Sequence, residues 1–174
     1  MGSCGKHYPG HGFVIPDSHV ELPVDNRSLA AMQEDIEPYR QLALDGVMAA
    51  HVIYECIDCN TAVFSNKWIT YLRNDIKFDG VVFTDDLSMA GAGVVGDMLN
   101  RVDTAYRAGC DMLLVCNAPE TVGRVLESWR PEVDVLRAKR IEALLPRSAS
   151  LNWQELQATP RYRAALKAIA ALPT

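Results

Sequence analysis

The sequence contains no apolar run that approaches the roughly 20 consecutive residues a helix needs to cross a bilayer. Residues 1–6 also lack the apolar core of a secretory signal peptide, which predicts a chain without such a signal. Positive charge is not in excess, because 17 Lys and Arg stand against 22 Asp and Glu and give a net charge of −5. This balance gives no electrostatic reason to expect nucleic acid or an anionic membrane surface as a partner.

Cysteine is scarce and odd in number, with five residues at positions 4, 56, 59, 110 and 116. Cys56 and Cys59 have the spacing of a redox motif or of half a zinc site. A structural zinc site needs about four ligands, and neither a second pair of cysteines at this spacing nor a spaced pair of histidines follows. We therefore expect reduced thiols in a cytoplasmic protein.

Short apolar runs alternate with amphipathic stretches along a chain that is 49% hydrophobic and long enough to bury a core as one domain. Continuous apolar runs of this length are typical of parallel strands buried on both faces, and they are found near residues 3–6 and at 46–50, 80–84 and 112–116. Helices are predicted at 66–73, over 95–106, from Pro119, at 132–145 and at 160–172. The fold class is α/β. Four such units amount to half of a (β/α)₈ barrel or to a small open sheet, and periodicity does not separate the two.

The beginning of the chain has a different pattern. Residues 3–27 are rich in Gly, Pro, His and Asp and show little periodicity, so they predict a long ordered loop. Ser28 is predicted to cap a helix that Pro38 interrupts or restarts.

Polar residues follow each predicted strand at the point where it ends, namely Lys6-His7, His51, Asp85-Asp86 and Cys116-Asn117. Sites in parallel α/β folds lie beyond the carboxyl ends of the strands, so we expect these side chains at one edge. Because side chains alternate along a strand, only one of Asp85 and Asp86 can face inward. We predict one functional aspartate and one that is structural or caps a helix.

Three histidines, His7, His11 and His19, fall within thirteen residues. The Pro and Gly residues between His7 and His11 prevent a helix that would place both side chains on the same face. No further metal ligand is found at a familiar spacing, so we expect no metal site. The pair Asp17-x-His19 has another use, since a carboxylate orients an imidazole and raises its basicity. His19 is therefore a candidate general acid/base, although this spacing is common by chance.

Four ordered motifs carry a resemblance to a known family. Lys6-His7-Tyr8-Pro9-Gly10-His11-Gly12, followed by Asp17-Ser18-His19, resembles the KH(F/Y)PGHG…DSH loop of bacterial N-acetylglucosaminidases of glycoside hydrolase family 3. The segments 48–54, 78–89 and 108–117 are similar to further motifs of that family.

The resemblance implies a (β/α)₈ TIM-type barrel that removes terminal β-linked N-acetylglucosamine from peptidoglycan fragments during cell-wall recycling in the bacterial cytoplasm. It implies a covalent glycosyl-enzyme, retention of configuration and no cofactor, with an N-acetylglucosamine-containing muropeptide as the carbohydrate partner. By position Asp85 matches the nucleophile, His19 the acid/base and Asp17 its partner. The implied substrate-binding residues are Lys6, His7, His51 and Met89.

The matching motifs begin at what is the fifth strand of such a barrel. Residues 1–174 are therefore predicted to form its C-terminal half, with an acid/base loop at 5–27, a nucleophile strand end at 80–89 and C-terminal helices at 132–172. A half-barrel leaves sheet edges that favour self-association. Its sugar pocket is about half built, so we expect little activity from these residues alone. The alternatives are an inert half-barrel that dimerises or needs complementation, and a metal-binding module formed by the three histidines.

Overall fold

The computed structural model describes residues 2–146 and 149–172. The chain, predicted as one domain, divides into two compact units, Met1–Leu144 and Leu145–Thr174. The second unit contains α6 (Trp153–Ala158) and α7 (Pro160–Ala170), and none of its described residues is buried. Two short helices do not supply enough apolar surface for a core of their own, so the fold that positions the rim residues is that of the first unit.

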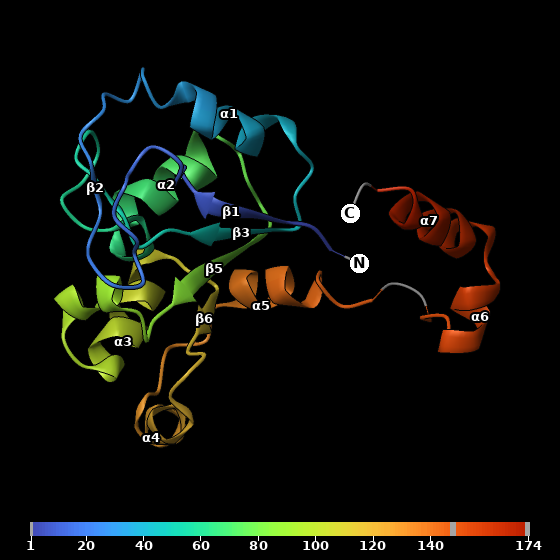
Figure 1. Cartoon of the computed structure of the whole chain (residues 1–174). Coiled ribbons are helices and arrows are strands. Elements are labelled where there is room, and N and C mark those ends of the chain that lie inside the picture. Colours follow the sequence, from blue (N-terminus) through green and yellow to red (C-terminus); the bar gives the residue numbers. More distant parts are fainter. Residues whose placement is uncertain (1, 147–148, 173–174) are drawn as a thin grey trace. The chain divides into compact units, whose positions relative to one another are not determined.

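The first unit is built on a parallel sheet with the order β1-β3-β5-β6 (Figure 1). Its strands are β1 (Cys4–Tyr8), β3 (Gly46–Ala49), β5 (Val81–Asp86) and β6 (Met112–Leu114). Each neighbouring pair is parallel, and Lys6, Met48, Phe83 and Met112 lie at one level across the sheet. The four predicted strands and the α/β class are thereby confirmed. We call the carboxyl-terminal edge of this sheet the rim.

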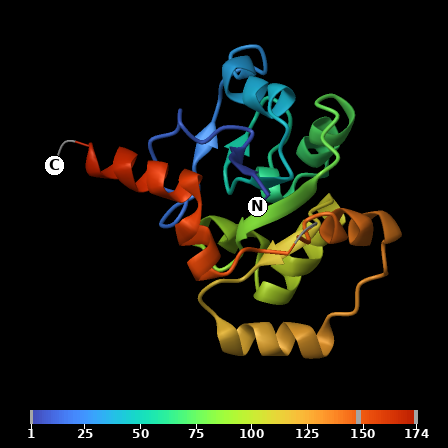
Figure 2. The same cartoon turned by 90° about the vertical axis from the view of Figure 1, so that its right-hand side faces the viewer.

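Helices follow the strands in the order expected of an α/β fold (Figure 2). They are α1 (Gln33–Gln41), α2 (Asn66–Asn74), α3 (Met98–Ala108), α4 (Pro119–Ser128) and α5 (Val135–Glu142), with 3-10 turns η1 (Ala62–Phe64) and η2 (Ala90–Val95). The helices predicted at 66–73, from Pro119 and within 132–145 are thus confirmed. Thr159 caps α7 through the N–H of Tyr162, as its place before Pro160 indicates.

The core lies between the sheet and the helices α1, α2 and α3. Trp68 is fully buried at its centre, with its ring centroid 5.9 Å from that of Tyr8 and 5.4 Å from that of Tyr54. The Tyr8 hydroxyl donates to the carbonyl of Trp68 over 3.2 Å. Aromatic pairs at these distances add to the free energy of area burial, so this cluster ties β1 firmly to α2.

Two local predictions differ from the structure. Pro38 lies inside α1 and does not interrupt it, because a proline removes only one backbone hydrogen bond and α1 is a short helix packed on the core by Ile36 and Tyr39. Ser28 caps the turn before α1, accepting from the N–H of Ala31, whereas α1 itself begins after Met32. A second, two-stranded sheet of β2 (Val24–Asp25) and β4 (Ile53–Tyr54) was not predicted, since two-residue strands leave no periodic pattern.

None of the helices in the described residues combines the length and the apolar character that crossing a membrane requires.

Gly109 ends α3 in the left-handed region, with φ 114°, and a Cβ there would lie 2.9 Å from Cγ2 of Ile69. We expect Gly109→Ala to lower the free energy of unfolding by about 1–3 kcal/mol, through backbone strain and overpacking. Gly123→Ala is the control, because Gly123 lies inside α4 with nothing within 4 Å of its added Cβ. The control should gain up to about 1 kcal/mol. Denaturant unfolding checks both, and equal stability of the two variants would contradict the expectation.

Candidate active site

The rim brings together several of the predicted residues from different strands. Asp85 at the end of β5 lies beside His7 near the end of β1, with 3.6 Å between Oδ2 and Nε2. The Asp85 side chain is 16% exposed and the His7 side chain is 29% exposed, so solvent reaches both. The other oxygen of Asp85, Oδ1, accepts the N–H of Asp86 over 2.8 Å. One carboxylate oxygen is thus fixed while the second faces the imidazole.

Asp86 points the opposite way and is buried. Its Oδ1 accepts the backbone N–H groups of Ser88 and Cys116, and its Oδ2 accepts the Ser88 hydroxyl and the Asn117 amide. Burial would raise the pKa of Asp86, but these hydrogen bonds outweigh it and hold the pKa below its ordinary value. The carboxylate therefore ties the end of β5 to the segment after β6.

His51, at the end of β3, is completely buried and lies under the rim instead of opening onto it. Its Nε2 lies 3.0 Å from the carbonyl oxygen of Asp86, and its ring packs 5.7 Å from that of Phe64. Burial lowers the pKa of His51, with opposing contributions from Asp85 and Asp86. A neutral ring then donates through Nε2 to Asp86 and leaves Nδ1, which has no partner among the described residues, as the acceptor.

The remaining predicted rim residues have different environments. Burial is the main reason that the pKa of His7 lies below its ordinary value, with the charge of Asp85 opposing the shift and that of Lys6 adding to it. His7 is therefore neutral near pH 7. Lys6 is exposed. Met89, by contrast, is buried, and its N–H donates to the carbonyl of Asp86 over 3.1 Å.

Asp17 and His19 form a compact dyad on the long loop after β1. Oδ1 of Asp17 accepts both the ring Nδ1 of His19, at 2.7 Å, and its backbone N–H, at 2.9 Å. The side chains are 64% and 72% exposed. The hydrogen bond that the His19 ring donates to Asp17 raises the pKa of His19, and the charges of Asp85 and Asp86 raise it further. Hydrogen bonds from His19, backbone first, lower the pKa of Asp17.

Two residues that the sequence did not single out hold this loop in place. Ser18, between the two members of the dyad, is buried, and its carbonyl accepts the N–H of Gly91 in η2 over 3.2 Å. The only sequence signal at Gly91 is the Ala-Gly-Ala-Gly run 90–93, which favours close backbone approach without naming the partner.

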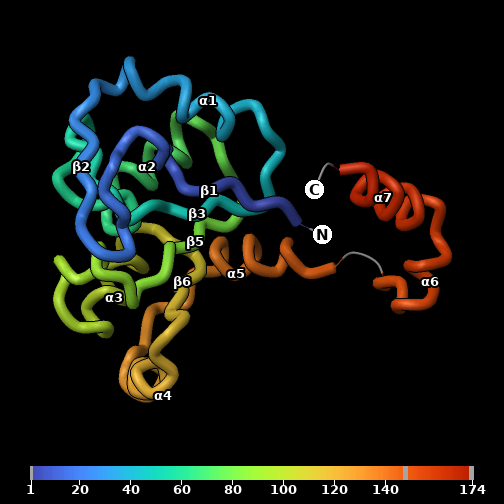
Figure 3. The backbone as a smooth tube through the Cα atoms, viewed as in Figure 1, coloured from blue at the N-terminus to red at the C-terminus, as the bar shows by residue number. Residues whose placement is uncertain are grey.

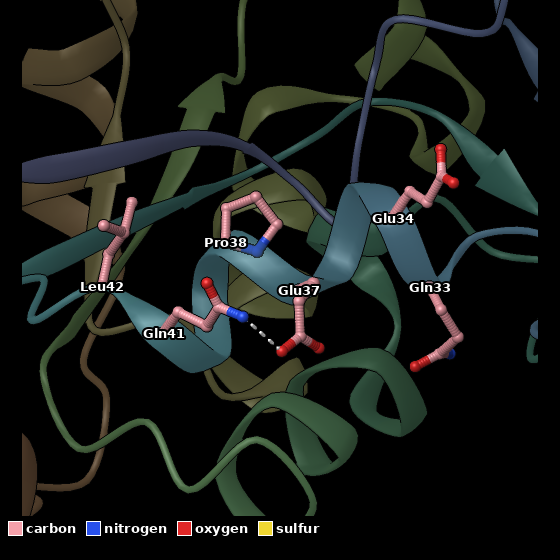
Figure 4. Close-up of a pocket in the computed structure, with 6 residues that line it drawn as sticks. All are labelled: Gln33, Glu34, Glu37, Pro38, Gln41 and Leu42. Carbon is pink, nitrogen blue, oxygen red and sulfur yellow. Dashed lines mark hydrogen bonds between the residues drawn. The ribbon is translucent and has the colours of Figure 1, made fainter.

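Two hollows lie beside α1, and only one of them is lined by predicted site residues. A hollow of about 640 Å³ lies along α1, where Gln41 donates to Glu37 across one turn (Figure 4). It contains none of the predicted site residues. A smaller hollow of about 390 Å³ is lined by Lys6, His7 and His11 together with residues of α1. The chemistry of the rim comes from the strand ends, so we place the candidate site there.

The described residues contain no group of three side chains suited to hold a metal ion. His7 and His11 approach each other edge to face, with 5.8 Å between ring centroids, while His19 pairs with Asp17. All five cysteines are free thiols.

Comparison with known proteins identifies the family. Residues 1–147 match the family described as Glycosyl hydrolase family 3 N terminal domain. The chain belongs to glycosyl hydrolase family 3. This confirms the resemblance inferred from the loop and strand motifs. The matched range covers the first compact unit and ends shortly after it.

Family 3 relatives and solved structures cover this chain almost completely. A protein of Aromatoleum aromaticum named Beta-hexosaminidase is 48% identical over an alignment of 177 positions, which covers 99% of this chain and 50% of the relative. Native NagZ from Neisseria gonorrhoeae superimposes with a TM-score of 0.86 at 38% identity, over 100% of this chain and 51% of that one. The same protein in complex with N-trifluoroacetyl-D-glucosamine gives 0.83 at 39% identity, over 98% of this chain and 51% of that one. The chain thus spans about half the length of these relatives; the C-terminal placement of that half stays a prediction.

Asp17→Asn should lower the pKa of His19, because it removes the negative charge and the strong acceptor that stabilise the imidazolium. Asp103→Asn is the control, since that carboxylate pairs with Arg107 on α3. Titration of the His19 ring proton by NMR measures both. An unchanged His19 pKa in Asp17→Asn would show that the dyad does not form in solution.

Proposed function

We propose that this chain carries the catalytic groups of a retaining β-N-acetylglucosaminidase. The observation that carries the proposal is the setting of Asp85, with Oδ1 held by the N–H of Asp86 and Oδ2 facing His7 at an accessible rim. A carboxylate fixed by one oxygen keeps the other oriented toward a ligand. Such pre-orientation favours nucleophilic attack, because little freedom is left to lose in the transition state.

The reaction proceeds in two displacements. Asp85 attacks the anomeric carbon of the sugar, the glycosidic C–O bond breaks, and the leaving oxygen takes a proton from the His19 imidazolium. In the second step neutral His19 removes a proton from water, whose oxygen attacks the same carbon and releases the Asp85 carboxylate. Two inversions at one carbon give net retention.

The dyad suits His19 to both proton transfers. Asp17 raises the pKa of His19 above its ordinary value, which favours the imidazolium that donates the proton in the first step. The transfer leaves a neutral ring that can accept a proton from water in the second step. Asp17 also fixes the ring, because its Oδ1 accepts Nδ1–H and leaves Nε2 as the group that exchanges the proton. The exposure of both side chains allows a bound sugar to reach them.

The relatives suggest the substrate class. The A. aromaticum relative is named Beta-hexosaminidase, and NagZ was solved with a glucosamine that carries an acyl group on nitrogen. By extension, the substrate of this chain is a terminal β-linked N-acetylglucosamine, bound through Lys6 and His7. His51 and Met89 are buried, so they support the rim from below instead of binding the sugar directly. We further propose peptidoglycan fragments as the source of that sugar and the bacterial cytoplasm as the place of the reaction.

In the full-length protein that contains this chain, Asp85→Asn should lower the turnover of an aryl N-acetylglucosaminide by at least about 10³-fold, because the nucleophile is lost. His19→Ala should cost about 10²-fold or more with poor leaving groups and far less with good ones, since only the former need a proton. Asp79→Asn, at a 94% exposed carboxylate before β5, is the control and should keep normal rates. Near-normal rates in Asp85→Asn would refute the nucleophile assignment.

A second candidate applies to the 174 residues on their own, and the edge strands favour it. In the described sheet β1 and β6 each pair on one side only, and the chain spans half the length of its relatives. Under this alternative the isolated polypeptide is inert and self-associates through its sheet edges or needs complementation.

Size-exclusion chromatography with light scattering, followed by an assay on a chromogenic N-acetylglucosaminide, tests the second candidate. We expect an oligomer with little or no activity. A monomer that turns over substrate at the rate of the full-length protein would exclude it.

A further inference from the structure

The loop that carries the acid/base dyad is held at its two ends. The Tyr54 hydroxyl donates to the carbonyl of Gly10 over 2.8 Å, and the N–H of Ile53 donates to the carbonyl of Pro23 over 3.0 Å. Between these points, over residues 11–22, Ser18 is the one buried residue. Figure 3 traces this loop, in blue, from β1 down to the yellow-green segment before α3 and back to β2.

Ser18 makes two contacts that fasten the middle of the loop. Its carbonyl accepts the N–H of Gly91 over 3.2 Å, and its hydroxyl lies 3.1 Å from Nε2 of His11. The residues on either side of it, Asp17 and His19, are exposed. The contact to Gly91 connects the turn that carries the dyad directly to η2.

Displacement of Ser18 would move both members of the dyad, because they share one tight turn. Asp17 accepts the backbone N–H groups of His19, Val20 and Glu21, the first through its side chain and the others through its carbonyl. Ser18 lies inside this turn. The turn therefore moves as one piece about the contact that Ser18 makes.

Gly91 is itself fixed relative to the nucleophile. The guanidinium of Arg101, on α3, donates to the carbonyls of Leu87 and Gly96, which bracket η2, over 2.8 Å each. The N–H of Met89 donates to the carbonyl of Asp86. The segment that contains Gly91 is thus connected to Asp86 and Leu87, which directly follow Asp85 in the chain.

The approach of the loop to η2 leaves little room for a side chain at position 91, so an added Cβ would push a neighbour away by a few tenths of an ångström. A Cβ on Gly91 would lie 3.1 Å from the carbonyl oxygen of Ser18, 3.2 Å from Cβ of His51 and 3.4 Å from the carbonyl oxygen of His51. Since His51 is buried in the core, the loop is the neighbour that can move away. Gly93, two residues on, is exposed, and its added Cβ would meet only the Arg101 guanidinium at 3.6 Å.

We propose that Gly91 and Ser18 form a latch that fixes the position of the Asp17–His19 dyad relative to Asp85. Both are positioning residues, since neither side chain needs to touch the sugar. The inference rests on the proposed function for its catalytic consequence, whereas the latch itself is a property of the fold. Release of the latch leaves the dyad intact but no longer holds it at the distance from Asp85 that proton transfer to a bound substrate requires.

Hydrogen exchange followed by mass spectrometry tests the latch without reference to catalysis. Gly91→Ala should accelerate exchange in peptides covering residues 14–22, whereas Gly93→Ala should leave them as in the unchanged protein. Ser18→Ala, which removes only the contact to His11, should accelerate the same peptides to a smaller extent and serves if Gly91→Ala does not fold. Equal exchange in all four proteins would overturn the proposal.

Kinetics of the full-length protein test the positioning role. Gly91→Ala should lower kcat for a substrate with a poor leaving group by about tenfold or more, because a small misplacement of a proton donor is costly. Gly91→Ala should have a far smaller effect on KM and on kcat for a substrate with a good leaving group. Gly93→Ala should leave kcat and KM unchanged for both substrates. An equal loss on both substrates would contradict a role in proton transfer. Activity that is absent in every protein, with the exchange difference present, would refute the proposed function and leave the latch standing.

Discussion

The buried carboxylate of Asp86 is the interaction on which the rim depends. It accepts hydrogen bonds from Ser88 within its own turn and from Cys116 and Asn117 after β6. These bonds extend the connection between the ends of β5 and β6, which already pair at Asp86 and Leu114. The backbone N–H of Asp86 donates to one carboxylate oxygen of Asp85, and the backbone carbonyl of Asp86 lies within hydrogen-bond distance of His51 Nε2. A buried charge that is fully hydrogen-bonded is costly to disturb, which makes the position of Asp85 rigid.

Two histidines near the same carboxylate are driven in opposite directions by their environments. The pKa of His7 is lowered by burial beside Asp85, whereas that of His19 is raised by its exposed pairing with Asp17. A neutral ring next to the nucleophile can donate a hydrogen bond without neutralising it. A ring that titrates on an accessible loop can exchange a proton with substrate. The division of roles follows from burial and not from residue type.

Membership of family 3 rests on a match over residues 1–147, and the matched relatives are about twice as long as this chain. Asp85 on β5, Lys6 and His7 on β1, and the Asp17–His19 pair on the loop after β1 are the groups proposed for catalysis and sugar binding. Catalysis also requires the sugar to be held in register with these groups, and the energetic value of that positioning is large. The catalytic groups and a complete binding pocket are therefore separate requirements of the proposed reaction.

The sequence by itself determined the α/β class and the four strands, because apolar runs are local properties of the chain. Strand-end polar residues and motif order pointed to Asp85, Asp17 and His19 as candidate site residues. The sequence failed for Pro38, where packing of α1 on the core overrides a local preference, and for the two-residue strands β2 and β4, which are defined only by their pairing. Only the tertiary structure decided which aspartate faces the rim and that His51 lies beneath it. The contact of Ser18 with Gly91 was likewise decided only by the tertiary structure, since it joins residues that are 73 positions apart in sequence. Such contacts depend on how separate elements pack, and no local pattern records that.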